Sequence, residues 1–409
     1  MAVTTIPWGD GSGDNIYLTY PSASGDQTVQ VSSDANTGST DRTKTITFTA
    51  SHHGTSDTKT LIVMQEGVPE AYIVFADPIV EQICATNWGD GVGLKPSQAA
   101  QVTNAQLGTT FRQNTDITSF DELQYFTGIT SLSNYAFQAC SALESIVFPS
   151  SLTTIAAQVF RDCSSLSGTV VIPSSVTSIG NLTFSGCVSV KNMTIESTAT
   201  IGSNISGTSA TTCLGDGTGT FHHKGSMTNA STYVFNFRKI IIDGDFSNTA
   251  NYALRFLIVN GAGTFEAMKI GGNYSTAGTS AANCRPIQGN ATFSNDAGQK
   301  FGFLEIMGTI TSNYNILGFD NRNGIKSGFI LHLGYDVVAN NAFPCTPTIA
   351  GASFTRLAKI YVGKGKSATE DNAILAKYLS DSAWSAYSSK LDTWYNYVND
   401  PNSNQYYIN

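Results

Sequence analysis

The chain has 409 residues, of which 13% are charged and 41% hydrophobic, and its formal net charge is −8. This length predicts more than one folded unit, and the hydrophobic fraction is large enough to bury cores, which argues against a disordered chain. An acidic balance without a run of Lys and Arg argues against a nucleic-acid-binding surface. No apolar run reaches about 18 residues, so we expect no membrane insertion.

Residues 1–68 consist of short segments in which apolar and polar side chains alternate. This pattern predicts strands at 15–20, 28–32, 42–50 and 58–65, with Gly, Asp, Asn and Ser in the turns between them. The Asn-rich turn, the strand that begins at Arg42 and the closing segment Val63-Met64-Gln65-Glu66-Gly67 resemble a BACON domain. This resemblance implies an immunoglobulin-like β-sandwich, a module of Bacteroidetes proteins and their phages.

The sequence Trp-Gly-Asp-Gly occurs twice, at residues 8–11 and 88–91. One interpretation is a turn with the Trp side chain anchored beneath it, and the other is a docking motif. On the second interpretation, Trp8, Asp10 and Asp14 form a candidate attachment turn.

Residues 69–127 predict a small helical connector. Asp77 followed by Pro78 is typical of a helix start, and we expect one helix over 77–84 and a second, shorter one over 96–102. A loop that contains Asp90 lies between them. Calcium loops of the helix–loop–helix type need several oxygen ligands within about twelve residues, and only Asp90 stands where one is needed. We therefore predict a structural turn without metal.

Residues 128–200 contain an internal repeat with a period of 23–24 residues. Four columns keep this spacing: Phe137, Phe160 and Phe184; Cys140, Cys163 and Cys187; Leu143, Leu166 and Val190; Pro149 and Pro173. Leu132, Ile155, Ile179 and Ile201 form a fifth column, whose last step is 22 residues. A single unit of this size cannot bury its own apolar face, so the units are expected to stack into a solenoid. The cysteine column is then a ladder of small buried side chains.

The segment Asn134-Tyr135-Ala136-Phe137-Gln138-Ala139-Cys140-Ser141-Ala142-Leu143 resembles the BspA-type leucine-rich repeat. The resemblance implies a parallel-sheet solenoid that serves surface adhesion or recognition and holds no catalytic residues. We expect strands at 146–148, 170–172 and 193–195 within it.

Residues 201–362 continue with wider spacing, and strand-like cores recur at 239–242, 267–270, 304–307, 329–333 and 358–362. We interpret them as irregular solenoid coils with long loops on one edge, where such proteins often bind. Residues 363–409 take helical spacing and predict a helical C-terminal cap. Its aromatic stripe, which includes Trp384 and Trp394, fits core packing better than a sugar platform.

The seven cysteines are odd in number and form no CxxC pair, which favours reduced, buried thiols over a disulfide framework. The pairs His52-His53 and His222-His223 lack a third metal ligand at a suitable spacing. Asp121-Glu122 is more typical of a helix start than of a glycosidase, and residues 215–219 are typical of a turn. We therefore predict no catalytic, cofactor-binding or metal-binding residues, no cofactor and no enzymatic activity, and the sequence leaves the ligand-binding residues unassigned.

The two modules in one chain resemble surface proteins of crAss-like Bacteroides phages. The first residues have no signal-like stretch, and the cysteines are unpaired, which favours a virion protein made in the host cytoplasm. Our leading hypothesis is a head fibre or capsid decoration on the virion surface. Its N-terminal module would hold capsid or other virion proteins, and its solenoid would bind a host-surface glycan or protein. We also expect a homo-oligomer, for which a trimer is one arrangement.

Two alternatives stay open. One is a Bacteroidetes cell-surface adhesin whose export signal is missing from this sequence. The other is an accessory binding chain of a carbohydrate-active system.

Overall fold

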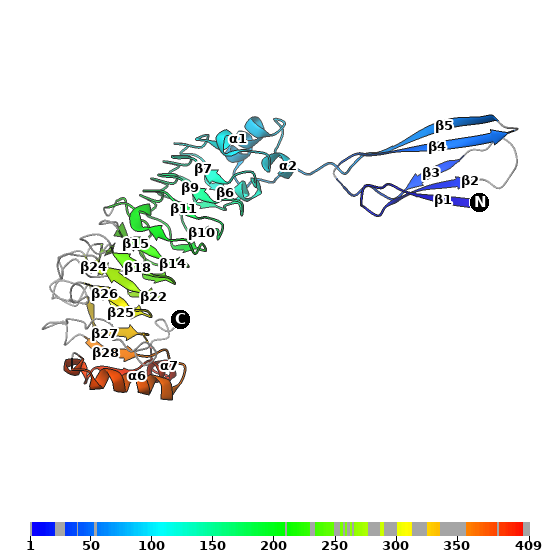
Figure 1. Cartoon of the computed structure of the whole chain (residues 1–409). Coiled ribbons are helices and arrows are strands. Elements are labelled where there is room, and N and C mark those ends of the chain that lie inside the picture. Colours follow the sequence, from blue (N-terminus) through cyan, green and yellow to red (C-terminus); the bar gives the residue numbers. More distant parts are fainter. Residues whose placement is uncertain are drawn as a thin grey trace. The chain divides into compact units, whose positions relative to one another are not determined.

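The computed structural model describes residues 2–20, 29–38, 40–52, 55–208, 211–229, 234–248, 254–256, 258–259, 262–263, 266–276, 287–289, 301–312, 325–335, 357–382 and 384–403. The chain divides into two compact units, Met1–Tyr72 and Ile73–Asn409 (Figure 1). The mainly β fold that the sequence predicts is confirmed: N-terminal sheets precede a β-solenoid, and short helices follow it. None of the helices in the described residues is long and apolar enough to cross a membrane.

The first unit contains two antiparallel sheets. Strands β1 (Ala2–Pro7), β2 (Asn15–Tyr20) and β3 (Gln30–Ser33) form one sheet, and the hairpin of β4 (Arg42–His52) and β5 (Thr55–Gln65) forms the other. Its buried core is small and comprises Trp8, Ile16, Leu18 and Ile46. Strand β1 was not predicted, because its sequence Ala-Val-Thr-Thr-Ile-Pro alternates poorly and ends in proline.

The second unit begins with three helices, α1 (Pro78–Trp88), α2 (Pro96–Ala99) and α3 (Asn104–Leu107), at one end of the solenoid (Figure 1). Asp77 is the N-cap of α1: its Oδ1 accepts hydrogen bonds from the backbone of Ile79 and Val80. Its Oδ2 accepts two more from the backbone and hydroxyl of Thr118. One buried carboxylate thus holds α1 against the first coil.

The leucine-rich-repeat coils begin after these helices. Their elements are β6 (Ser119–Phe120), η1 (Asp121–Tyr125), β7 (Ser131–Leu132), β8 (Ser145–Ile146), β9 (Thr154–Ile155), β10 (Thr169–Ile172) and β11 (Ser178–Ile179). Pairing between coils is parallel, with β6 beside β8 and β7, β9 and β11 in one sheet. Each strand here is only two to four residues long, because each coil turns a corner after it.

The phenylalanine column forms a continuous stack in the interior. Phe111, Phe137, Phe160 and Phe184 lie with successive ring centroids 5.4 Å apart and interplanar angles of 14°, 7° and 9°. All four side chains are buried. Phe111 was not among the predicted column members, and it extends the stack by one coil toward the N-terminal helices.

The cysteine column lies beside this stack and has a specific role. The thiols of Cys140, Cys163 and Cys187 donate to the backbone carbonyls of Phe111, Phe137 and Phe160, at 2.9, 3.1 and 3.1 Å. Each bond joins one coil to the preceding one and satisfies a buried carbonyl group. The predicted ladder of small buried side chains is therefore present, and it is hydrogen-bonded. Cys284 and Cys345 lie outside the described residues.

The later coils add a third face to the solenoid, and their bounds are as follows: β12 (Asn192–Ile195), β13 (Ile201–Gly202), η2 (Ser203–Ile205), β14 (Thr220–His223), β15 (Met227–Asn229), β16 (Val234–Phe235), β17 (Lys239–Ile242), β18 (Phe246–Asn248), β19 (Leu254–Phe256), β20 (Ile258–Val259), β21 (Ala262–Gly263), β22 (Ala267–Ile270), β23 (Tyr274–Thr276), β24 (Ile287–Gly289), β25 (Phe301–Ile306), β26 (Ile310–Ser312), β27 (Ile325–Leu333) and β28 (Leu357–Val362). The long loops predicted on one edge of these coils stay a prediction, and residues 290–300, 313–324 and 336–356 lie outside the described residues.

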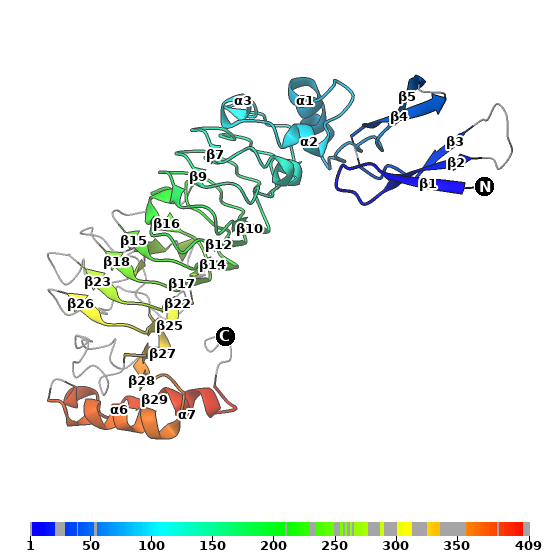
Figure 2. The ribbon, with the colours of Figure 1, turned by 45° about the vertical axis from the view of Figure 1, so that its right-hand side comes forward.

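Three parallel sheets run along these coils. Nine strands form the longest, in the order β10-β12-β14-β17-β22-β25-β27-β28-β29. A five-stranded sheet, β13-β15-β18-β23-β26, runs beside it (Figure 2). Strands β16, β19 and β24 form a third sheet. The first two sheets advance together, coil by coil, toward the C-terminal helices.

The C-terminal segment differs from the prediction in one respect. It contains α6 (Ala368–Ser380), η5 (Ser385–Tyr387), β29 (Leu391–Thr393) and α7 (Trp394–Asn399). The expected helical spacing through Leu391 is wrong, because residues 391–393 pair in parallel with β28 and complete the nine-stranded sheet. Leu391 and Thr393 are buried in the solenoid. Without β29, the edge of β28 would expose unpaired backbone groups and apolar side chains to water.

Phe160→Ala is expected to lower the free energy of unfolding by about 3–5 kcal/mol, because the ring lies between two stacked neighbours and its removal leaves a cavity. Urea denaturation of the full chain checks this. Val171→Ala is the matched control, since Val171 lies on the outer face of β10 and is 47% exposed. A loss below about 0.5 kcal/mol at Phe160 would contradict the stacked interior.

The thiols of Cys140, Cys163 and Cys187 are expected to react slowly in the native protein and rapidly after denaturation. Burial raises the pKa of each of these thiols, and the thiolate is the reactive form. Titration with a thiol reagent, followed by mass spectrometry of the labelled peptides, checks this. Rapid native labelling of all three would show that the column is exposed.

Candidate functional site

The predicted attachment turn lies in the first unit, and the structure brings its three residues together around Arg42. Asp10 and Asp14 bind the Arg42 guanidinium at 3.3 and 2.8 Å. The same guanidinium lies 4.4 Å from the centroid of the Trp8 ring, which is only 5% exposed. Trp8 is thus anchored beneath the turn, and its ring is covered by Arg42. These contacts give the cluster a structural role, and an attachment role for the turn stays a prediction.

The electrostatics of this cluster follow from its hydrogen bonds. Hydrogen bonds from the Ser12 hydroxyl and backbone, aided by Arg42, lower the pKa of Asp10 to about 2. Burial by itself would lower the pKa of Arg42, but hydrogen bonds to Asp14 and Asp10 outweigh it and raise this pKa. Arg42 also donates hydrogen bonds to the Gln65 side chain and to the Asp34 carbonyl. All three guanidinium nitrogens therefore bond within the first unit.

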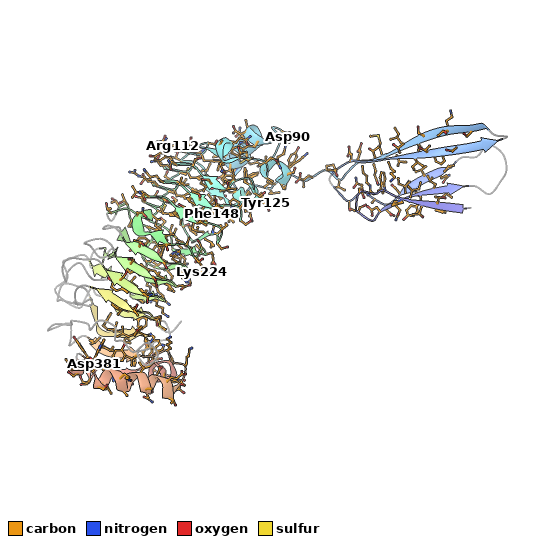
Figure 3. All side chains as sticks on the ribbon, viewed as in Figure 1. Asp90, Arg112, Tyr125, Phe148, Lys224 and Asp381 are labelled. Atoms are coloured by element: carbon orange, nitrogen blue, oxygen red, sulfur yellow. The ribbon has the colours of Figure 1, made fainter. Side chains whose placement is uncertain are left out.

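The loop with Asp90 forms a turn closed by its own side chain. Asp90 Oδ1 accepts hydrogen bonds from the backbone of Val92 and Gly93, at 3.0 and 3.1 Å. Asp90 lies at the helical end of the second unit (Figure 3). Among the described residues, no group of three or more His, Cys, Asp and Glu side chains could hold a metal ion.

The second histidine pair is split between the two faces of one strand. His222 lies on the outer face of β14 and pairs with Asp243 at 3.0 Å, whereas His223 is fully buried and binds the Ser226 carbonyl. Burial lowers the pKa of His223. Because neighbouring strand residues point to opposite faces, the two rings cannot share one metal ion. Of the first pair, the side chain of His52 and all of His53 lie outside the described residues.

Two further predicted motifs take structural roles. Asp121 and Glu122 open the short helix η1, where Glu122 is buried and accepts a hydrogen bond from the backbone of Ala76. In the segment 215–219, the Asp216 carboxylate accepts hydrogen bonds from the backbone and hydroxyl of Thr218 and closes a turn.

A charged and aromatic cluster that the sequence did not indicate covers the outer face of the nine-stranded sheet near its C-terminal end. His332 is 1% exposed, its Nδ1 lies 2.7 Å from the Glu305 carboxylate, and its Nε2 lies 2.8 Å from the Gly363 carbonyl. The Trp394 ring stacks on His332 with centroids 3.8 Å apart. Helix α7, which begins at Trp394, thereby covers this part of the sheet.

The charged side chains of this cluster and its neighbours are shielded from solvent, and this shielding shifts their pKa values. Burial favours the neutral form of Glu305, but the hydrogen bond and charge of His332 outweigh it and lower the Glu305 pKa. Burial lowers the pKa of Lys239 to about 8 and lowers the pKa of Lys269 as well. His332 and Glu305 therefore form a buried pair on the sheet, and the Trp394 ring stacked on His332 fastens the C-terminal cap.

A hollow of about 590 Å³ lies in the N-terminal helical region of the second unit. It is lined by Asn87, Trp88, Gly89, Ser97, Gln98, Gln101, Val102 and Gln106. None of these lining residues is charged. A second hollow of about 530 Å³ lies over the first coils, and its lining mixes Ser and Thr with apolar side chains and the acidic Asp121 and Glu144. Of the residues that line the first hollow, the sequence pattern indicated only Trp88, within the repeated Trp-Gly-Asp-Gly sequence, and not the glutamines.

A signal for two of these glutamines is present in the sequence. Thr103 and Gln106 are three residues apart, the spacing of a capping box at a helix start. At Lys95 and Gln98 only the glutamine half of that arrangement is present, because a lysine side chain cannot accept a hydrogen bond. This pattern predicts where the amide oxygens bind. It does not predict that two such helices lie beside one Trp.

Two family models match parts of the chain. Residues 109–213 match the BspA type leucine-rich repeat region, in six copies, and residues 9–66 match BACON, described as "Putative binding domain, N-terminal". The repeat match begins inside the segment that the sequence assigned to the helical connector. A comparison with curated proteins gave no match.

These matches point to a broad class of protein. BACON and BspA-type modules in one chain indicate a surface or binding protein of the Bacteroidetes type, and they fit a bacterial cell-surface protein.

The stability that Asp10 contributes to the first unit is expected to depend on pH. Its folded pKa of about 2 lies below the ordinary 3.8, so this stabilisation is present above pH 3.8 and is lost as the pH falls through about 2. Carboxyl NMR titration of Asp10, with thermal unfolding at each pH, measures both quantities. In Asp10→Asn the unfolding temperature is expected to change less over this window, and an unchanged profile would contradict the assignment.

Proposed function

We propose that the protein is a non-catalytic surface recognition protein, in which the solenoid binds and the first unit attaches. The observation that carries this proposal is the outer face of the nine-stranded sheet. Parallel register places Thr194, His222 and Ile241 next to one another on successive strands, in the part of this face that lies before the cluster covered by α7. Solenoids of this kind present extended surfaces built from equivalent positions of neighbouring coils.

The bonding of the titratable side chains supports a binding role over a catalytic one. His222 pairs with Asp243, and His332 pairs with Glu305 beneath Trp394. Asp371 accepts backbone hydrogen bonds from Lys364, Gly365 and Tyr395 and so ties the loop before α6 to α7. These groups hold the scaffold together in the way that structural ion pairs do.

The division of the chain into two compact units supports separate roles for them. The first unit is small and matches a model described as a binding domain found N-terminally. The second has its own continuous core, which runs from Ile73 to Leu391. Attachment through the first unit leaves the solenoid surface accessible to a host-surface glycan or protein.

We further propose that the surface in question is that of a phage virion, with the protein as a head fibre or capsid decoration. The five described cysteines are free and buried, and burial raises the pKa of each thiol. A fold whose thiols are hydrogen-bonded interior groups suits assembly in a reducing cytoplasm. A homo-oligomer on the particle stays part of this proposal.

The alternative is a bacterial cell-surface adhesin. The two family matches favour it, because both modules fit a bacterial cell-surface protein. The two proposals share the same recognition surface and differ in the body to which the first unit attaches.

The chain truncated to residues 69–409 is expected to keep a cooperative melt and to keep binding to Bacteroidetes cells, because its coils are closed at both ends. It is expected to lose incorporation into particles. The measurements are calorimetry, cell pull-down and analysis of purified particles, with the full chain and the isolated residues 1–68 as controls. Normal incorporation of the truncated chain would refute attachment through the first unit. Cell binding by residues 1–68 alone would reverse the two roles.

A further inference from the structure

The hollow at the N-terminal end of the solenoid has donors and acceptors whose directions are already fixed. Gln98 Oε1 accepts the backbone N–H of Lys95 at 2.8 Å, and Gln106 Oε1 accepts that of Thr103 at 2.9 Å. A backbone N–H can only donate, so the oxygen of each amide must face it. Each bond therefore leaves the NH₂ group as the free end of a side chain that lines the hollow.

Asn87 is oriented in the opposite sense. Its Nδ2 donates to the Ile83 carbonyl at 2.7 Å, because a carbonyl can only accept. This leaves its Oδ1 as an acceptor at the wall of the same hollow. Two oriented donors and one oriented acceptor, on three short helices, surround one space.

Trp88 gives the hollow a fixed apolar wall. Its ring lies at the end of α1 and packs against Phe126 and Phe111, with centroids 5.7 and 6.3 Å apart. Trp88 is only partly buried, whereas Trp8, Trp384 and Trp394 are 5%, 1% and 7% exposed. An indole that is held on one side and open on another is a common platform for the apolar face of a ligand.

We propose that this hollow binds a neutral sugar unit of a surface glycan. The proposal rests on the surface-recognition function proposed above and names a site and a ligand class for it. Sugar hydroxyls can both donate and accept, which matches the Gln98 and Gln106 donors and the Asn87 acceptor. The carbon-bound hydrogens of the sugar would lie on Trp88. A volume of about 590 Å³ lies within the range of small-ligand sites.

The lining also argues against a charged ligand. A carboxylate, phosphate or ammonium group needs an opposite charge or several charge-assisted hydrogen bonds when it leaves water. The lining residues offer amides, a serine hydroxyl and an indole, and no charged side chain. Because each of the three amides is held by a hydrogen bond to the backbone, little side-chain freedom is lost when the ligand binds.

Gln101→Trp tests the site without removing the hydrogen bonds that hold Gln98 and Gln106. Gln101 is exposed and lines the hollow, so a large side chain there is expected to fill it and to weaken binding at least tenfold. Gln82→Trp is the matched control, since Gln82 is an exposed glutamine of α1 that does not line the hollow. All the proteins are full-length, and their melting temperatures are compared first.

Gln98→Glu tests the ligand class. A Glu side chain can still accept the Lys95 N–H, but it replaces the NH₂ donor by an anionic oxygen. Affinity for N-acetylglucosamine is expected to fall relative to that for glucosamine, whose amino group is cationic. Gln82→Glu controls for the added charge.

The probes are an array of neutral and acidic oligosaccharides, calorimetric titration with the free sugars, and binding to Bacteroidetes cells. The expected result is binding to neutral sugars that Gln101→Trp weakens and Gln82→Trp does not. Equal binding by both variants, or binding to acidic sugars alone, would overturn the site. A chain that binds cells but no sugar would overturn the site and leave the recognition function standing. A chain that binds neither would refute both.

Discussion

The stacked phenylalanines and the thiols beside them are the interaction on which the second unit depends. Ring centroids 5.4 Å apart, from Phe111 to Phe184, set the spacing of successive coils. Each cysteine thiol donates to a phenylalanine carbonyl of the preceding coil. A coil of 23–24 residues cannot bury its apolar face alone, so each depends on its neighbours. These inward positions are committed to stacking, and only the outward positions are free to recognise a ligand.

A solenoid has two open ends, and each is closed by different chemistry. At the N-terminal end, buried Asp77 joins α1 to residue 118, and Trp88 extends the aromatic interior. At the C-terminal end, β29 completes the sheet and α7 places Trp394 over the His332–Glu305 pair. Residues at the two ends need not follow the repeat pattern, because no further coil stacks on them. It is in the N-terminal end, among short helices, that the structure forms a hollow with oriented amides and an indole.

The charged groups show a common pattern. Arg42 binds Asp10 and Asp14 above Trp8, and Glu305 binds His332 on the sheet. Buried ion pairs of this kind add little net stability, but they are costly to break and so favour one arrangement over others. In this protein they fasten a turn in the first unit and a helix in the second. The surfaces left for recognition are those built from hydroxyls, amides and aromatic rings.

The sequence alone determined the repeat, its buried columns and the mainly β fold, because stacking forces the same residue type to recur at every 23–24 residues. It could not show that Leu391 adds a strand, since three residues are too few for alternation to be recognised. Nor could it bring Trp394 onto His332, or Gln98 and Gln106 beside Trp88. Those neighbours come from different elements, and no period relates them. The period of the sequence shows which residues lie on the same face of the solenoid. The residues that pack against its two ends and its turns are set only by the tertiary structure.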